Sequence, residues 1–184
     1  MISKETLLKY IDLGFTSFCC GTLEQAKMIK NIDSKFETIA SITSHVDAKM
    51  IKENISDYLQ YFNYIVLDFH YNRDLQEIKE LPPEMNYILL INSICNSKCK
   101  GTQHWFSEGK AFECPGLIVS KGFDNSCLIR PMDLKYFDPY IKIYKIQDRS
   151  WPTFEILHDI VLYTTDFSYY PGIKYDEDIY EVLS

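Results

Sequence analysis

The chain has 184 residues, 46% of them hydrophobic, which is enough for one domain with a substantial core. Its formal net charge of −7 argues against a nucleic-acid-binding surface, because such surfaces concentrate lysine and arginine. No apolar run approaches the roughly 20 residues of a membrane span, and MISKETLLKY at the N-terminus lacks the apolar core of a secretory signal. We therefore expect a cytoplasmic protein with no membrane and no nucleic-acid partner.

The N-terminal half alternates helical patterns with short apolar runs. A helix is expected over residues 3–13, ended by Gly14 in a left-handed conformation. A strand over residues 15–20 follows, and TLEQ at residues 22–25 matches a capping box that begins a helix reaching about residue 30. The next expected elements are a strand, two helical segments and a third strand, at residues 38–44, 47–54, 56–61 and 64–69.

The same alternation continues in the C-terminal half. Asn72 or Asp74 is expected to cap the helix RDLQEIKEL, which Pro82 and Pro83 stop. The remaining expected elements are a strand at 87–94, a short helix begun by Pro131, a strand at 140–146, a helix at 152–163 and a Tyr-rich tail from about residue 166 that packs on the single domain.

Alternating strands and helices predict an α/β fold with parallel strands and right-handed crossovers. The strands are too few for a complete eight-fold barrel, so we expect a partial β/α barrel or an open doubly wound sheet. Ligand sites in such folds lie at the carboxyl ends of the strands. The polar and thiol residues expected at that edge are Cys19, Cys20, Ser44, His45, Asp68, His70, Asn72, Arg73, Asn92, Cys95, Lys145, Gln147, Asp148 and Arg149.

Three basic residues of this set, Arg73, Lys145 and Arg149, could bind a carboxylate, which arginine holds in a bidentate manner. The alternative is that they form ordinary surface salt bridges. No Ser/His/Asp set and no His-Glu-x-x-His motif can be recognised, so a hydrolase of either type is not predicted.

Six cysteines in a cytoplasmic chain are expected to be thiols, metal ligands or redox groups rather than structural disulfides. Cys95 and Cys99 flank three polar residues directly after the strand at 87–94. Thiolates gathered there suit zinc or an iron–sulfur cluster, although the spacing matches neither a zinc ribbon nor a ferredoxin. Further donors along the chain are His104, Cys114 and Cys127.

The alternative for the cysteines is a structural one, because a free cysteine commonly fills a small buried apolar position. It fits Cys19, Cys20 and Cys127 better than Cys95 and Cys99, which stand in a polar turn. His104 could likewise be a loop residue beside Trp105.

Three stretches resemble, in order, the collagenase-like peptidase U-32 family: YIVLDFHYNRDLQEIKEL, NYILLINSICNSKCKGTQHW and CLIRPMDLKYFDPYIKIYKIQDR. They contain a strand followed by Asn and Cys, a Cys-x3-Cys-x4-His motif, IRPMDL and KIQDR, and the match covers residues 65–149. The chain departs from the family in being short, in carrying Asp148 where KIEGR has Gly, and in lacking the peptidase signature.

This resemblance implies a partial β/α barrel and an oxygen-sensitive iron–sulfur cluster of the 4Fe–4S type. Several family members resemble oxygen-independent hydroxylases of RNA or quinone precursors, so a hydroxylase or other redox enzyme acting on a small molecule or peptide is expected rather than a protease. The expected cluster ligands are Cys95, Cys99, Cys114 and Cys127, with Cys20 or His104 as alternates. The expected substrate-binding residues are His70, Arg73, Asn92, Lys145 and Arg149.

A second hypothesis is a non-catalytic partner or peptide-binding subunit whose zinc or cluster is structural. Its motivation is the incomplete barrel, which would expose strand edges and one apolar sheet face. Either hypothesis predicts association, with a second copy of the chain or with another protein.

Overall fold

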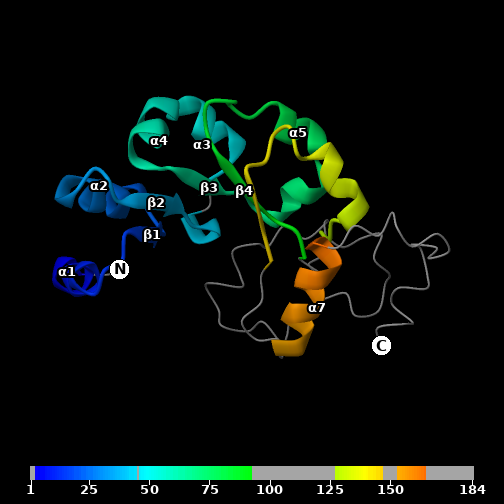
Figure 1. The fold of residues 1–184 in the computed structure, drawn as a ribbon. Coiled ribbons are helices and arrows are strands. Elements are labelled where there is room, and N and C mark those ends of the chain that lie inside the picture. The colour runs from blue at the N-terminus through cyan, green and yellow to red at the C-terminus, as the bar shows by residue number, and fades with distance from the viewer. Residues whose placement is uncertain (1–2, 45, 93–126, 147–152, 165–184) are drawn as a thin grey trace, which may run out of the picture. The chain divides into compact units, whose positions relative to one another are not determined.

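The structure is a computed structural model that describes residues 3–44, 46–92, 127–146 and 153–164 (Figure 1). The chain divides into two compact units, residues 1–147 and 148–184. The first unit contains all five described strands and has the α/β architecture that the sequence predicts.

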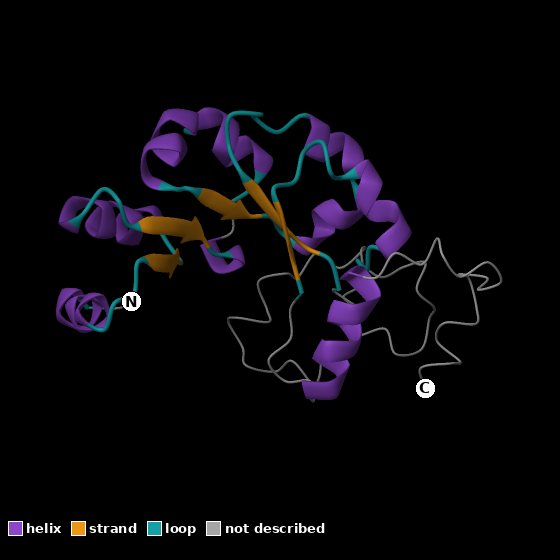
Figure 2. Cartoon of the chain, in the orientation of Figure 1, coloured by secondary structure: helices purple, strands orange, loops and turns teal. Residues whose placement is uncertain are grey.

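Strands and helices alternate along the first unit (Figure 2). The five strands are β1 (Ser17–Cys20), β2 (Glu37–Ala40), β3 (Tyr64–Val66), β4 (Tyr87–Leu90) and β5 (Ile143–Lys145). The α-helices are α1 (Lys4–Asp12), α2 (Leu23–Ile32), α3 (Ala48–Glu53), α4 (Ile55–Tyr61) and α5 (Leu75–Lys79). The 3-10 helices are η1 (Ile42–Ser44), η2 (Phe69–Arg73) and η5 (Pro131–Tyr136).

The strands form one parallel sheet in the order β1-β2-β3-β4-β5, so every neighbouring pair is also consecutive in sequence. Helices α3, α4 and α5 lie above the strands in the view of Figure 1, and α2 contacts both β2 and α4. The carboxyl ends of all five strands therefore meet at one edge of the sheet, as parallel pairing requires.

Local signals at the helix ends are confirmed. The Ser3 hydroxyl accepts from the Thr6 amide at the start of α1, and Gly14 follows this helix with φ of 90°. At α2 the Thr22 hydroxyl accepts from the Gln25 amide, while Gln25 Oε1 accepts from the Gly21 amide at 2.8 Å. These contacts satisfy amides that the helix itself leaves without partners.

Several strands are shorter than expected, and after β3 a side chain stabilises the turn that replaces the end of the strand. Residues 64–69 were predicted as one strand, but β3 stops at Val66 and η2 begins at Phe69. Asp68 caps this 3-10 helix by accepting from the His70 amide at 3.0 Å. Of the two predicted caps for the next helix, Asp74 fills the role and accepts from the Glu77 amide at 2.9 Å.

The two faces of the sheet differ in exposure. Four residues that share one face, Cys20, Ala40, Ile65 and Leu89, are 1% exposed or less. On the opposite face the side chains are buried in the middle of the sheet and exposed toward both edges. That face carries Cys19, Ile39, Tyr64, Val66, Ile88, Leu90 and Ile143, of which Cys19 and Ile143 are exposed.

A polar network occupies the amino-terminal edge of the sheet. Asn63 Oδ1 accepts from the Thr38 amide and from Lys30 Nζ, both at 2.9 Å. Lys30 Nζ also donates to the Phe36 carbonyl at 2.7 Å. Because these groups satisfy backbone atoms of β2 and its neighbours, we assign this network a structural role.

The described part of the second unit is α7 (Thr153–Thr164). Phe154, Leu157 and Val161 are exposed and share one face of this helix, because they are three and four residues apart. Among the described residues no helix is long and apolar enough to cross a membrane.

Candidate functional site

The carboxyl edge of the sheet brings together several of the predicted site residues. His70 and Arg73 lie in η2 directly after β3, Asn92 follows β4 by two residues, and Lys145 ends β5. Cys20 ends β1 at the same edge. The parallel pairing places the ends of these strands at the same edge, whereas His45, Gln147, Asp148 and Arg149 lie outside the described residues.

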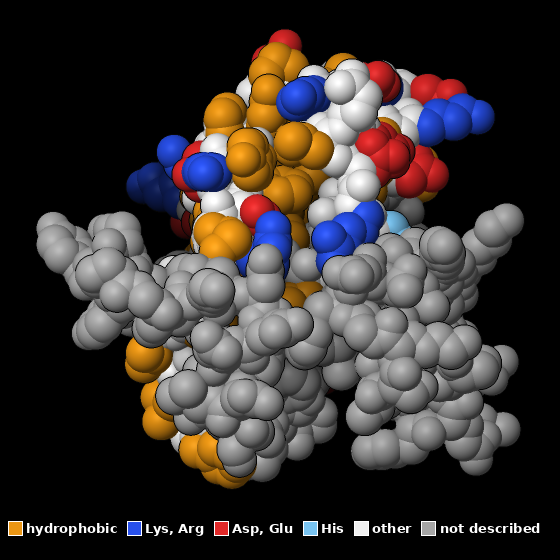
Figure 3. Space-filling model, turned by 90° about the vertical axis from the view of Figure 1, so that its right-hand side faces the viewer, with side chains coloured by type: hydrophobic (Ala, Val, Ile, Leu, Met, Phe, Trp, Pro, Cys, Tyr) orange, Lys and Arg blue, Asp and Glu red, His pale blue; other side chains and the backbone are white. Residues whose placement is uncertain are grey.

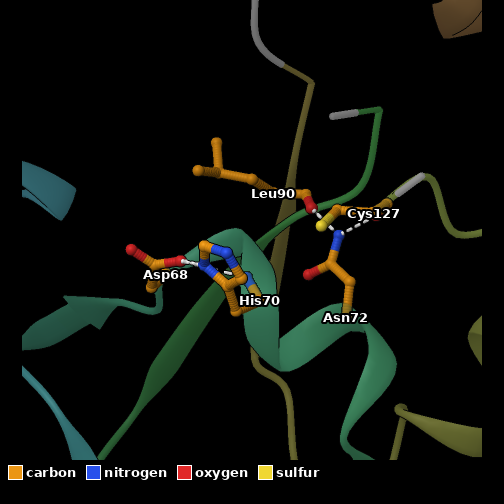
Figure 4. Close-up of polar contacts among 5 residues, drawn as sticks. All are labelled: Asp68, His70, Asn72, Leu90 and Cys127. Carbon is orange, nitrogen blue, oxygen red and sulfur yellow. Dashed lines mark hydrogen bonds and ion pairs between the residues drawn. The ribbon is translucent and has the colours of Figure 1, made fainter. Parts of the chain in front are cut away.

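An aspartate–histidine pair stands at the end of β3 (Figure 4). Asp68 Oδ1 lies 2.5 Å from His70 Nδ1, and the same oxygen accepts from the His70 amide. Both side chains are partly buried, at 24% and 29% exposure. A carboxylate on Nδ1 fixes the tautomer and the ring orientation, so His70 would exchange a proton or bind a ligand through Nε2.

Asn72 lies in the same 3-10 helix, two residues after His70, and its side chain is only 4% exposed. Its Nδ2 donates to the carbonyl oxygens of Leu90 at 2.6 Å and Cys127 at 2.5 Å (Figure 4). Asn72 therefore joins three parts of the chain at the carboxyl edge. Its Oδ1 is buried and accepts no hydrogen bond from the described residues.

Asn72 connects two stretches of chain that are separated by a long segment, residues 93–126. Leu90 ends β4 before residues 93–126, and Cys127 follows them. The Ile129 amide also donates to the Ile91 carbonyl at 2.9 Å. The described residues on either side of segment 93–126, Leu90 and Ile91 before it and Cys127 to Ile129 after it, are thus held side by side at the carboxyl end of β4.

Cys20 and Cys127 are the predicted cluster donors that the structure describes, and both are buried. Burial raises the pKa of the Cys20 thiol to about 11, so this group is protonated at neutral pH in the absence of a metal. Cys127 packs with Phe69 and Ile42 in an apolar cluster. This packing agrees with the structural alternative for both cysteines, and it does not test the cluster.

The other predicted cluster donors, Cys95, Cys99, His104 and Cys114, lie outside the described residues. Within residues 3–44, 46–92, 127–146 and 153–164, no three His, Cys, Asp or Glu side chains gather as a metal site would require. Of the predicted set of four ligands, the described residues include Cys127.

The predicted substrate-binding residues differ in their surroundings. Arg73 and Lys145 are exposed, whereas Asn92 is 4% exposed. On the face in Figure 3, hydrophobic side chains are exposed between basic and acidic side chains. Lys145 pairs in register with Leu90 and so projects at the edge where Asn72 holds β4.

Two features of the site were not identified from the sequence, the contact between Asp68 and His70 and the bridge formed by Asn72. Asp68 and His70 were both expected at this edge, and their spacing of two residues after an apolar strand is a signal for the pair. Asn72 was considered only as an edge residue or a helix cap. Its contact with Cys127 spans 55 positions, and nothing local in the sequence indicates it.

Fold and site together define an α/β protein with a sequentially ordered parallel sheet and a polar carboxyl edge that carries a histidine held by a carboxylate. Comparison with known proteins adds no relative, because no family model matches the chain and no curated protein or solved structure is similar to it.

Proposed function

We propose that the chain is an iron–sulfur enzyme, or the subunit of one, built on a partial β/α barrel with its site at the carboxyl edge of the sheet. Its reaction would be an oxygen-independent hydroxylation or another redox modification of a small molecule or peptide, as the resemblance to the peptidase U-32 family implies. The single observation that carries the proposal is that Asn72 holds Leu90 and Cys127 together at the edge where Asp68 and His70 lie.

The barrel part of the proposal is supported by strand order. A sheet ordered β1 to β5 with right-handed crossovers places its connecting helices on one face, as in a closed barrel. The opposite face would then line the barrel interior. Its apolar side chains Val66, Ile88 and Leu90 pack together in agreement with that role.

The proposed iron–sulfur site is supported by the contacts that Asn72 makes on either side of the cysteine-containing segment. Asn72 holds together Leu90 and Cys127, and the chain between them contains Cys95, Cys99 and Cys114. We propose that Cys95, three residues after Asn92, supplies a ligand at this edge, since a chain spans at most about 3.5 Å per residue. Cys127 is the fourth proposed ligand and lies at the same edge. A bound cluster would supply the one-electron chemistry.

The residues of the chain itself would bind and orient the substrate. His70, aligned by Asp68, would exchange a proton with it through Nε2. Arg73, Lys145 and Arg149 would hold an acidic group of the substrate, with arginine supplying bidentate geometry.

The alternative is a non-catalytic subunit that binds a protein or peptide and carries zinc or a cluster as a structural group. It is favoured by one observation, the close packing of Cys127 with Phe69 and Ile42, which is typical of a structural position. Both alternatives share the thiol set, so metal identity separates them.

The test is the iron and sulfide content of protein prepared without oxygen. The iron–sulfur proposal predicts stoichiometric iron and acid-labile sulfide, lost in Cys95→Ser and Cys99→Ser. Cys19→Ser is the matched control and should keep both, because Cys19 lies at the far edge strand and is not a proposed ligand. Stoichiometric zinc without sulfide would favour the structural alternative, and a full complement of iron and sulfide in Cys95→Ser would refute the proposed ligand set.

A further inference from the structure

The edge of the sheet at β1 has no described strand beyond it, and β2 pairs with its other side. The Thr16 carbonyl oxygen accepts from the Glu37 amide in β2. The Cys20 carbonyl oxygen accepts from the amide of Ser41, the residue that follows β2. Since backbone groups alternate in direction along a strand, the N–H and C=O groups of Ser17 and Cys19 point away from β2. Two residues therefore present four backbone hydrogen-bonding groups at this edge.

On either side of Ser17 and Cys19, the backbone amides of Phe15 and Gly21 already donate hydrogen bonds within the chain. The Phe15 amide donates to the Tyr10 carbonyl at 3.1 Å, and the Gly21 amide donates to Gln25 Oε1 at 2.8 Å. The stretch available to another strand is consequently short and is centred on Phe18.

The chemistry of this edge contrasts with that of the opposite edge. FTSFCC at residues 15–20 contains no charge and no proline, the two features that usually protect an edge strand from pairing. At the other edge, Lys142 directly precedes β5 and Lys145 ends it, and both lysines are exposed. Of the two edges of the described sheet, the β1 edge is the one chemically suited to accept another strand.

Exposed apolar side chains adjoin the same edge. Leu13 is 74% exposed and Phe15 is 52% exposed, both just before β1. Tyr10, whose ring meets that of Phe15 edge-to-face, is 43% exposed. A cluster of this kind beside an open strand is typical of an interaction surface.

We propose that β1 pairs antiparallel with β1 of a second copy of this chain, about a twofold axis at Phe18. Ser17 of each copy would then lie opposite Cys19 of the other, in the hydrogen-bonded type of pair. These two pairs use all the outward N–H and C=O groups of both copies.

The same register places Phe15 opposite Gly21 of the second copy. An aromatic ring across from a glycine covers the backbone that the glycine leaves open. Self-pairing is favoured over a foreign strand because one register satisfies both the hydrogen bonds and this contact, with no charge in either strand. A twofold axis is also the commonest symmetry of soluble oligomers. The inference names a surface for the association proposed above and does not depend on the cluster.

The first test is sedimentation velocity of the full chain under reducing conditions. The wild type is expected to dimerise at micromolar concentration. Cys19→Lys should raise the dimer dissociation constant about tenfold or more, because it brings two like charges to the centre of the contact. Cys19→Ser is the matched control at the same exposed site and should dimerise like the wild type. A monomeric wild type, or a dimer unaffected by Cys19→Lys, would overturn the proposal.

The second test addresses register. In Ser17→Cys the new thiol would face Cys19 of the second copy at a Cα separation of about 5.5 Å, within the range of a disulfide. Mild oxidation should give a covalent dimer in which peptide mapping finds residue 17 joined to residue 19. Addition of Cys19→Ser should abolish that linkage, and a linkage only between two copies of residue 17 would overturn the register.

Discussion

Asn72 illustrates how much one buried amide can organise at the residue scale. Its Nδ2 satisfies two carbonyl oxygens from segments that are far apart in sequence, and the side chain is 4% exposed. A buried carbonyl that loses its donor costs its full desolvation free energy, which exceeds the net value of the hydrogen bond. The position of Cys127 beside β4 thus depends on this amide.

Asn72→Ala is predicted to lower the free energy of unfolding by about 2–4 kcal/mol, because it removes both hydrogen bonds that Asn72 Nδ2 donates to buried carbonyl groups. Asn86→Ala is the matched control: its Nδ2 makes one bond, to the exposed Asn63 carbonyl at 3.1 Å, so it should cost under about 1 kcal/mol. Urea unfolding monitored by circular dichroism measures both. Equal costs for the two variants would show that Asn72 does not stabilise the fold in this way.

At the scale of elements, helix ends agree most closely with expectation. Each cap depends on side chains within four residues, as with Thr22 and Gln25 at α2. Strand ends agree less, because a strand stops where its neighbours stop pairing with it. Asp68 shows a local cause as well, since its carboxylate stabilises the 3-10 turn that replaces the end of the expected strand.

Gly14→Ala is predicted to destabilise the chain by about 1 kcal/mol, because Gly14 has φ of 90° at the end of α1. No atom lies within 4 Å of the position of an added Cβ, so the cost should be conformational rather than steric. Gly14→Asn should recover part of it, because asparagine tolerates the left-handed region better than alanine. Urea unfolding distinguishes these variants, and identical stability of the two would contradict a conformational cause.

At the scale of the whole molecule, the net charge opposes association of two copies, whereas the position of β1 at the edge of the sheet favours it. The chain carries a formal charge of −7, so two copies repel each other at a distance. The contact proposed at β1 contains no charge and is held by hydrogen bonds and apolar side chains. Salt should therefore screen the repulsion without weakening the contact.

We predict that the dimer dissociation constant falls several-fold when sodium chloride is raised from about 50 to about 300 mM. Sedimentation velocity at the two concentrations checks the direction. Dissociation promoted by salt would instead indicate ion pairs across the interface, and with them a contact at some surface other than β1.

The sequence by itself determined the α/β class, the helix ends and the gathering of His70, Arg73, Asn92 and Lys145 at one edge. These follow from apolar periodicity, from capping within a few residues and from parallel pairing, which puts all carboxyl ends together. The cluster assignment to Cys95, Cys99 and Cys114 stays a prediction, since those residues lie outside the described ones.

Only the tertiary structure decided that Asn72 bridges Leu90 and Cys127, that Cys20 and Cys127 are buried, and that β1 is an edge strand. Each of these depends on which distant segments become neighbours. A strand's own residues show that it can pair, but hydrogen-bonding groups are alike along every backbone. Which side of β1 stays open is therefore set by the order of the strands in the sheet.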